Sequence, residues 1–313
     1  MLWKVRAAKR SLIAALGIVS CAACGFLTSS SASDADAGQD GSADANTDGI
    51  ETDAAAEADE ATASSCDTGG SVTLDPRTLG HLEVWYGADS VVADGGTVQE
   101  WPDLSSNGRV ARVPTDCVAP RYATSDAGLP QVVFAGDDLT LHSCMLFPLG
   151  ADPGFERGVT LVVVARVHAT SFASAGSAHP FVRVGGAGET FYFLLGLYPD
   201  TYTLLYKVES KPYLRAPAVA LDAWHIYDAV QQPGAPGLGA TSTAVIHRDG
   251  VIEVDGPAIV PTHAQRDFNW IGRGENGYVN ADFAAVLLFS QALSDCDMAR
   301  LRASLAAQWN VTP

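Results

Sequence analysis

Three adjacent residues with side chains of the types used in catalysis are His247, Arg248 and Asp249. Phosphoryl transfer at such a triplet also needs an Asn five positions after the Asp to hold a metal ion, and Val254 occupies that position. No glycine-rich phosphate loop precedes the triplet, and no Asp-Phe-Gly follows it. The sequence therefore excludes this chemistry.

The triplet fits the end of a β-hairpin better than a catalytic centre. It lies between two runs of alternating residues, and Asp-Gly is a preferred two-residue loop of a type I′ turn, in which both positions need positive φ. Successive side chains of a strand point to opposite faces. We expect Asp249 and Gly250 to form the turn. His247 and Arg248 should then point apart and cannot act on one substrate atom.

Acidic and amide side chains in two predicted loops are candidate calcium ligands. Asp103, Asn107, Asp137 and Asp138 are the candidates. Calcium prefers oxygen ligands, and several loops can supply them together. Because Asp and Asn are also ordinary turn residues, a purely structural role is the alternative. No cofactor other than calcium is a candidate.

Four tyrosines are candidate ligand contacts because of where they stand relative to predicted strands. They are Tyr198, Tyr202, Tyr213 and Tyr278. Exposed aromatic side chains on loops over a sheet face could stack on sugar rings. The alternative for each tyrosine is packing in the core or along a sheet edge.

The elements that must position these residues are predicted to be strands. Short runs rich in β-branched and aromatic residues are separated by Gly, Pro, Asp and Asn, and they cover 81–87, 131–136, 139–143, 158–169, 181–186, 190–198, 202–208, 224–231, 243–254 and 283–290. No run of helical period separates them, so parallel βαβ units are disfavoured. Many strands in one domain favour an all-β, antiparallel sandwich of two sheets.

One short helix is predicted at the C-terminus. Ser294 is a good N-cap, and the two acids that follow it suit the first turn of a helix. Met298, Leu301 and Leu305 recur at helical spacing, and Trp309 continues the same face. We expect this face to pack on the sandwich.

The N-terminal segment has the features of a bacterial lipoprotein signal. Four bases precede an apolar run that is too short to span a bilayer. The letters IVSC at 18–21 then resemble a lipobox, which implies a signal peptide over residues 1–20 and a lipid on Cys21. An ordinary signal peptide with an incidental cysteine is the alternative. Because residue 22 is Ala rather than Asp, we expect the outer membrane and the cell surface.

Residues 21–65 are predicted to be a disordered linker after the lipidated cysteine. They contain ten acids, no base and almost no large apolar residue, so they cannot bury enough surface to offset chain entropy. A single domain over 66–313 follows. The chain has a net charge of −17, to which the signal segment contributes +4 and the linker −10, so this domain carries about −11. Such an acidic domain disfavours nucleic acid as a partner.

Four cysteines fall in the predicted domain, namely Cys66, Cys117, Cys144 and Cys296. Their spacings are too wide for the usual zinc patterns, and an exported chain meets an oxidising compartment, so disulfides are expected. Three pairings are open. We favour Cys117 with Cys144 and Cys66 with Cys296.

Two segments together resemble the LamG-like jelly-roll domains of the concanavalin A-like lectin/glucanase superfamily. In 221–256, a Trp-His opens one strand and an Asp-Gly closes a hairpin some two dozen residues later. In 269–311, a glycine turn precedes a strand of the F-x-A-x-V-L-x-F kind and a short helix that ends near a Trp. The segments 82–111 and 128–141 resemble the opening of bacterial members. The resemblance covers nearly all of 78–311.

The resemblance implies a jelly roll that binds glycans or proteins, with calcium in some relatives and glycosidase activity in others. Retaining glycosidases of this fold use the order Glu-x-Asp-x-x-Glu, which places a carboxylate pair on one strand face. The nearest match begins at Glu253 and Asp255, but Ala258 replaces the last Glu, and we expect Gly256-Pro257 to break the strand. The match therefore disfavours hydrolysis.

The sequence thus predicts a lipid-anchored envelope protein whose domain binds a glycan or a protein ligand without catalysis. A diverged glycoside hydrolase or lyase on the same fold is one alternative, and a purely structural envelope protein is another. Two carboxylates facing each other in a cleft would favour the enzyme. A shallow rim of aromatic side chains without such a pair would favour binding.

Overall fold

A computed structural model of the chain describes residues 73–136, 142–169, 178–185, 192–198, 201–208, 213–235, 240–261, 266–274 and 277–312. The predicted signal peptide, the lipidated Cys21, the linker and Cys66 lie outside the described residues. Within the described residues, none of the helices has the length and apolar character needed to cross a membrane.

The described chain is built almost entirely of strands. The strands are β1 (Leu82–Gly87), β2 (Val92–Asp94), β3 (Thr97–Trp101), β4 (Ala111–Arg112), β5 (Arg121–Thr124), β6 (Pro130–Phe134), β7 (Met145–Phe147), β8 (Val159–Val167), β9 (His179–Gly185), β10 (Tyr192–Tyr198), β11 (Thr203–Val208), β12 (Tyr213–Ala218), β13 (Trp224–Gln231), β14 (Thr241–Arg248), β15 (Val251–Ile259), β16 (Asn269–Ile271) and β17 (Ala281–Phe289). Two 3-10 turns, η1 (Pro76–Leu79) and η2 (Ala88–Ser90), and one α-helix, α1 (Asp295–Trp309), complete it. The prediction of an all-β domain with one C-terminal helix is confirmed.

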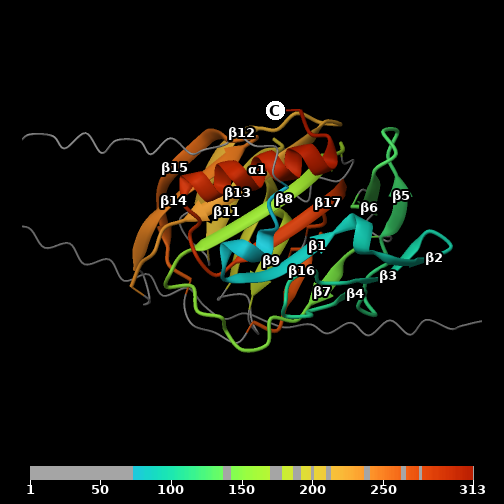
Figure 1. The fold of residues 1–313 in the computed structure, drawn as a ribbon, viewed down its shortest axis with the longest axis horizontal. Coiled ribbons are helices and arrows are strands. Elements are labelled where there is room, and N and C mark those ends of the chain that lie inside the picture. Colours follow the sequence, from blue (N-terminus) through green and yellow to red (C-terminus); the bar gives the residue numbers. More distant parts are fainter. Residues whose placement is uncertain are drawn as a thin grey trace, which may run out of the picture. The chain divides into compact units, whose positions relative to one another are not determined.

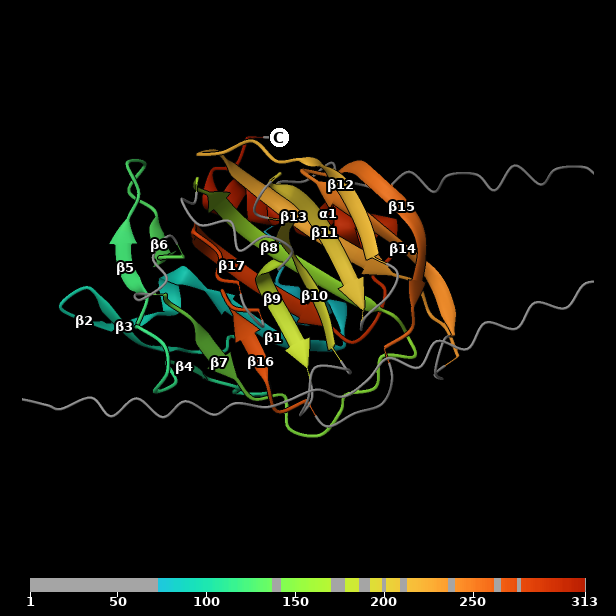
Figure 2. The ribbon, with the colours of Figure 1, turned by 180° about the vertical axis from the view of Figure 1, so that it is seen from behind.

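The strands form two layers (Figure 1). The first layer has the order β15, β14, β13, β8, β17 and β1. The second has the order β7, β16, β9, β10, β11 and β12, and Figure 2 shows most of these strands side by side. All the ladders between these strands are antiparallel, as predicted.

The two layers belong to one continuous sheet, whereas the sequence predicted two separate sheets. From β17 the ladder continues through β6, β5, β3 and β4 to β7. On the other side, a Cβ on Gly256 of β15 would meet Leu214 of β12 at 3.0 Å, so the far ends of the sheet nearly touch. A sheet that folds back on itself leaves few edges that could pair with another chain.

The core lies between the two layers. Phe181 of β9 stacks on Tyr227 of β13 with ring centroids 5.2 Å apart, and it meets Phe283 of β17 edge-on. The Tyr206 hydroxyl of β11 donates to Gln231 Oε1 of β13, so this buried hydroxyl is paired across the core. β8 pairs with both β13 and β17 and is almost entirely buried, which explains its unbroken apolar sequence.

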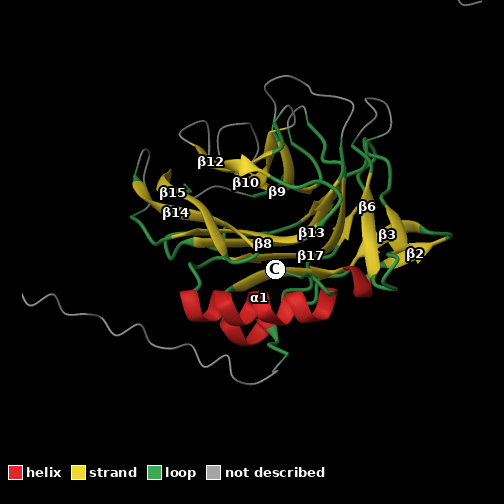
Figure 3. Ribbon diagram, turned by 90° about the horizontal axis from the view of Figure 1, so that it is seen from above, coloured by secondary structure: helices red, strands yellow, loops and turns green. Residues whose placement is uncertain are grey.

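Helix α1 covers the outer side of the first layer (Figure 3). The Ser294 side chain accepts from the backbone N–H of Asp297, which confirms the predicted N-cap. The predicted apolar face, Met298, Leu301, Leu305 and Trp309, is buried. The other outward-facing side of the sheet belongs to the second layer, and its side chains are exposed on β12.

The hairpin of β14 and β15 confirms the predicted turn. Asp249 and Gly250 have φ values of 52° and 82°, as a type I′ turn requires. The prediction that Gly256-Pro257 breaks the strand is wrong, because β15 runs on to Ile259. Among the described strands β15 pairs only with β14, and an edge strand tolerates a proline whose missing N–H faces away from the ladder.

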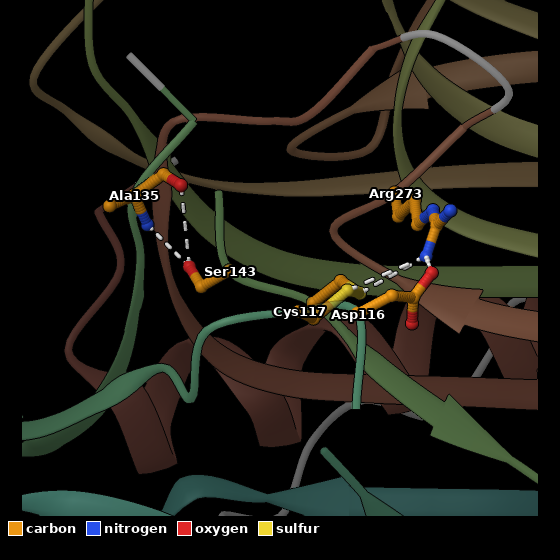
Figure 4. The surroundings of a disulfide bond; sticks show 6 residues. Asp116, Cys117, Ala135, Ser143 and Arg273 are labelled. Atoms are coloured by element: carbon orange, nitrogen blue, oxygen red, sulfur yellow. Dashed lines mark hydrogen bonds and ion pairs between the residues drawn. A yellow bond between two sulfur atoms is a disulfide. The ribbon is translucent and has the colours of Figure 1, made fainter. Parts of the chain in front are cut away.

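A disulfide joins Cys117, in the loop before β5, to Cys144, just before β7 (Figure 4). This predicted pairing is confirmed. Arg273 lies beside it, and its Nη1 donates to Asp116 Oδ2 at 2.6 Å. Cys296 is also disulfide-bonded, but Cys66 lies outside the described residues, so the second pairing stays a prediction.

Candidate ligand-binding site

The four strands β9 to β12 are notable for their charge. Their sequences contain Arg183, Lys207 and Arg215 and no Asp or Glu, although the chain carries a net charge of −17. The register pairs Arg183 with Leu194, Leu194 with Lys207, and Lys207 with Tyr213. Because residues paired across a ladder share a face, these side chains form one row on the outer side of the second layer.

Two tyrosines and an arginine gather on this face near the β12 edge. The rings of Tyr198 and Tyr213 are stacked, with centroids 6.2 Å apart and an interplanar angle of 28°. The guanidinium of Arg215 lies 4.0 Å from the Tyr198 centroid and 4.8 Å from the Tyr213 centroid. We call Tyr198, Tyr213 and Arg215 the tyrosine–arginine patch. Strand alternation explains it in part, since Tyr213 and Arg215 are two residues apart on β12.

Arg215 is held by these aromatic contacts and by one hydrogen bond. Its Nη2 donates to the Tyr213 hydroxyl at 2.9 Å. A guanidinium has five N–H donors in a planar fork, so most of its donors stay available. No carboxylate among the described residues forms an ion pair with Arg215 or with Lys207.

The same face becomes buried away from the β12 edge. Tyr192, Leu194 and Leu205 form a small apolar cluster of their own, and Tyr198 packs against it. Arg183 and Lys207 both lie over the Tyr192 ring, at 4.5 and 5.1 Å from its centroid. The patch therefore stands at the accessible end of a larger aromatic and cationic surface.

The structure brings together only two of the four predicted tyrosines. Tyr202 has a φ of 49°, precedes β11 and packs against the main core. Tyr278 lies near β16, at the other end of the second layer, and its ring stacks on His142 with a centroid distance of 3.7 Å. Tyr198 and Tyr213 lie together in the patch, while Tyr202 and Tyr278 lie elsewhere. The ligand role of all four tyrosines stays a prediction.

The surroundings of Tyr278 are crowded with internal contacts. Arg273 lies 4.4 Å from the Trp270 centroid and 5.7 Å from that of Tyr278, and it also reaches the disulfide sulfurs. Burial raises the pKa of the Tyr278 hydroxyl. The hydrogen bond from Arg273 lowers the pKa of Asp116. The charge of Arg273 is thus already balanced.

The described calcium candidates make hydrogen bonds within the protein. Both oxygens of Asp103 accept, from the backbone N–H groups of Trp85, Ser105 and Arg109 and from the Ser105 hydroxyl. Asn107 Nδ2 donates to two backbone carbonyls of β1, those of Leu82 and Glu83. Asp137 and Asp138 lie outside the described residues. No group of three or more His, Cys, Asp or Glu side chains in the described ranges could hold a metal ion, and calcium stays a prediction.

The side chains of His247, Arg248 and Asp249, at the end of β14 and in the turn after it, do not meet at one point. His247 Nδ1 lies 2.8 Å from Asp228 Oδ1 under helix α1, whereas Arg248 pairs with Glu253 on the other face of the hairpin. The Asp249 carboxylate accepts from the Ile226 N–H and lies 2.6 Å from His225 Nδ1. The prediction that the side chains of His247 and Arg248 point apart is confirmed.

A second charged cluster ties β8 to β17. Arg166 donates to Asp282 Oδ2 at 2.6 Å, and His168 lies between Asp282 and Asp222, at 3.0 and 2.6 Å. The hydrogen bond to Asp282 raises the pKa of His168, although burial opposes this. Burial disfavours ionised Asp282, but the hydrogen bonds from His168 and Arg166 outweigh it and lower the pKa of Asp282.

Sequence reasoning missed Arg215 and Lys207. A usable signal was present, because the letters YLR place Arg215 on the same strand face as Tyr213. The pairing of Lys207 with Tyr213 depends on the register of β11 and β12, and the sequence alone does not give that register.

The fold and the patch together define an all-β domain whose continuous antiparallel sheet presents an aromatic, cationic face. No protein-family model matches the sequence, and no curated protein matches it. The similarity to known proteins is therefore structural.

Solved structures share the fold at low sequence identity. The binding domain of botulinum neurotoxin serotype D/C aligns over 72% of this chain and 52% of its own, with 10% identity and a TM-score of 0.51. The binding domain of botulinum neurotoxin DC in complex with SialylT gives 12% identity and a TM-score of 0.50 over the same shares. Domain 4 of AbnA, a GH43 extracellular arabinanase from Geobacillus stearothermophilus in complex with arabinotriose, gives 10% identity and a TM-score of 0.48 over 71% of this chain and 98% of its own. This chain thus spans about half of each neurotoxin chain.

Proposed function

We propose that the domain binds a glycan without catalysis at the tyrosine–arginine patch, and that it is a jelly roll of the concanavalin A-like kind. One observation carries the proposal: two stacked tyrosines and an arginine without an acidic partner lie together on an accessible sheet face. The likeness to the neurotoxin binding domains concerns the fold alone, so the proposal rests on the patch.

The chemistry of the patch suits a sugar. Sugar rings present apolar C–H faces that pack on aromatic rings, and their hydroxyls need fixed polar partners. Tyr213 is 38% exposed and offers such a ring. Arg215 offers N–H donors that are already oriented.

Hydrolysis does not fit this face. A glycosidase of the usual kind needs two carboxylates flanking the bond to be cleaved, about 5 to 9.5 Å apart. Strands β9 to β12 contain no acidic residue. Binding without catalysis is therefore the role that these strands support.

The cellular setting in the proposal is the cell envelope, with the chain lipid-anchored through Cys21 and displayed by the acidic linker. The anchor rests on the lipobox resemblance of residues 18–21. Replacing Cys21 with Ser should move the protein from the membrane fraction to the soluble fraction. If the Cys21→Ser protein stays in the membrane fraction, the anchor is wrong.

The glycan role is tested by applying the full chain, kept in mild detergent, to a glycan array with and without EDTA. We expect a bound glycan whose signal falls about fivefold or more in Tyr213→Ala, because stacking on an aromatic ring contributes about 1 kcal/mol or more. Tyr213→Phe keeps the ring and should keep most of the signal. Loss of the signal in EDTA would support calcium. An array without any bound glycan, together with capture of an envelope protein that Tyr213→Ala abolishes, would replace the glycan by a protein ligand.

A further inference from the structure

We propose that the tyrosine–arginine patch selects glycans that carry an anionic group, a carboxylate or a sulfate. This inference rests on the proposed function of the patch as a glycan site and names the class of glycan. It comes from the cations of the second layer rather than from its aromatic rings.

The first step concerns where the charge of the domain lies. The domain carries an excess of acids, yet strands β9 to β12 have three cations and no acid. Elsewhere, the half-buried arginines are paired with acids: Arg302 with Asp228, Arg166 with Asp282. On these strands, by contrast, Arg215 and Lys207 form no ion pair with a described carboxylate.

The second step concerns how Arg215 is held. A free arginine side chain has high rotamer entropy, but Arg215 is restrained by two rings and by the Tyr213 hydroxyl. A restrained planar fork matches the two oxygens of a carboxylate or of a sulfate, and such bidentate pairs are the strong, specific ones. A neutral sugar would use this fork only as a weak donor of single hydrogen bonds.

The third step concerns the second cation. Lys207 pairs with Tyr213 in the ladder, so its side chain lies on the same face next to the patch. It lies over the Tyr192 ring, and no described carboxylate forms an ion pair with it. Lys207 therefore adds a second positive charge to the same face, on the strand next to Arg215. In the proposed complex Arg215 binds the anionic group, and the rings of Tyr198 and Tyr213 contact the body of the sugar.

The test measures binding of matched pairs of probes by titration calorimetry with the full chain. The carboxylate pairs are sialyllactose with its carboxyl-reduced form and a hexamer of galacturonate with its carboxyl-reduced form. The sulfate pair is a sulfated hexasaccharide with its desulfated form. We expect at least one anionic probe to bind about tenfold or more tighter than its neutral partner, since a hydrogen bond to a charged group contributes at least this factor.

Variants separate the charge from the rings. Arg215→Gln should bring the anionic probe down to the affinity of its neutral partner, and Arg215→Lys should fall between. Arg121→Gln is the matched control, because Arg121 is an exposed arginine of strand β5 that lies over no aromatic ring of the described residues, and it should leave the affinity of every probe unchanged. Near-ultraviolet circular dichroism checks that each variant keeps its packing.

Three outcomes decide the matter. If an anionic probe wins and Arg215→Gln removes the advantage, the inference stands. If neutral and anionic partners bind equally, and Tyr213→Ala still weakens both, the charge selectivity is wrong while the glycan role survives. If no probe of either kind binds, the inference is overturned, and a blank glycan array overturns the glycan role with it.

Discussion

Besides its apolar face, helix α1 contacts the sheet through an ion pair between Arg302 and the buried Asp228. Replacing Arg302 tests how much this pair stabilises the fold. Asp228 on β13 is fully buried. It accepts from Arg302 Nε and Nη2 at 2.8 Å each, and His247 Nδ1 lies 2.8 Å from it. Arg302→Met keeps the length of the side chain but removes both donors, leaving the carboxylate with His247 alone.

The expected loss follows from this geometry. Removing one partner of a buried ion pair costs about 3–5 kcal/mol, because an uncompensated charge stays buried. His247 still compensates part of the charge, so we expect about 3 kcal/mol. With a urea dependence of about 2–3 kcal/mol per molar for a domain of this size, the midpoint of unfolding should fall by about 1 M with the slope unchanged.

Arg300 on the same helix supplies the control. Its side chain is 48% exposed, and it meets Asp297 at 3.7 Å. An exposed pair of this kind contributes about 1 kcal/mol or less, so Arg300→Met should shift the midpoint little. The double variant Asp228→Asn with Arg302→Met removes the orphaned charge and should recover part of the loss. Equal midpoints for Arg300→Met and Arg302→Met would refute the reasoning.

Three further perturbations have defined outcomes. Gly250→Ala places a Cβ on a residue with φ of 82° and should lower the free energy of unfolding by about 1 kcal/mol; an unchanged urea midpoint would contradict the turn. The pairing of His168 with Asp282 should stabilise the fold most between the ordinary carboxyl value of 3.8 and the ordinary imidazole value of 6.5. Its contribution is lost as pH falls through the lowered pKa of Asp282, and lost again as pH rises through the raised pKa of His168. The difference in unfolding free energy from His168→Gln, followed by urea titration against pH, should therefore peak in this window, and a flat difference would speak against it. The double replacement of Cys117 and Cys144 by Ser removes a disulfide between residues 27 positions apart and should lower the free energy of unfolding, measured in guanidinium, by roughly 3–4 kcal/mol. A loss below about 1 kcal/mol would mean that the disulfide contributes little to stability.

The sequence predicted the long strands well because each carries a strong local pattern. β8, β13 and β17 are long runs of β-branched and aromatic residues, and the Asp-Gly turn has a steric cause. β3, β4, β5 and β7 were missed because two to five residues give too short a period to recognise. These are the strands that join the layers, and the prediction of two separate sheets failed for this reason.

The polar contacts show where prediction from sequence stops. Asp-Gly at 249–250 predicts a turn, but it does not predict that the Asp249 carboxylate also holds His225 and the Ile226 N–H, because those residues are two dozen positions away. In the structure, His225 of the Trp-His pair and Asp249 of the Asp-Gly turn are hydrogen-bonded to each other. The pair of Asp228 and Arg302 spans 74 positions and has no local signature at all.

The two sides of the domain use charge in different ways, and this difference underlies the proposed ligand site. Under helix α1, Asp228 is buried and fully paired, because an unpaired buried charge would destabilise the fold. On the outer side of the second layer, Arg215 is ordered by tyrosines without an acid to balance it. An exposed arginine of this kind adds little to folding stability, and the contacts with Tyr198 and Tyr213 set its position. In the proposed role, an anionic ligand supplies the acidic partner that Arg215 lacks among the described residues.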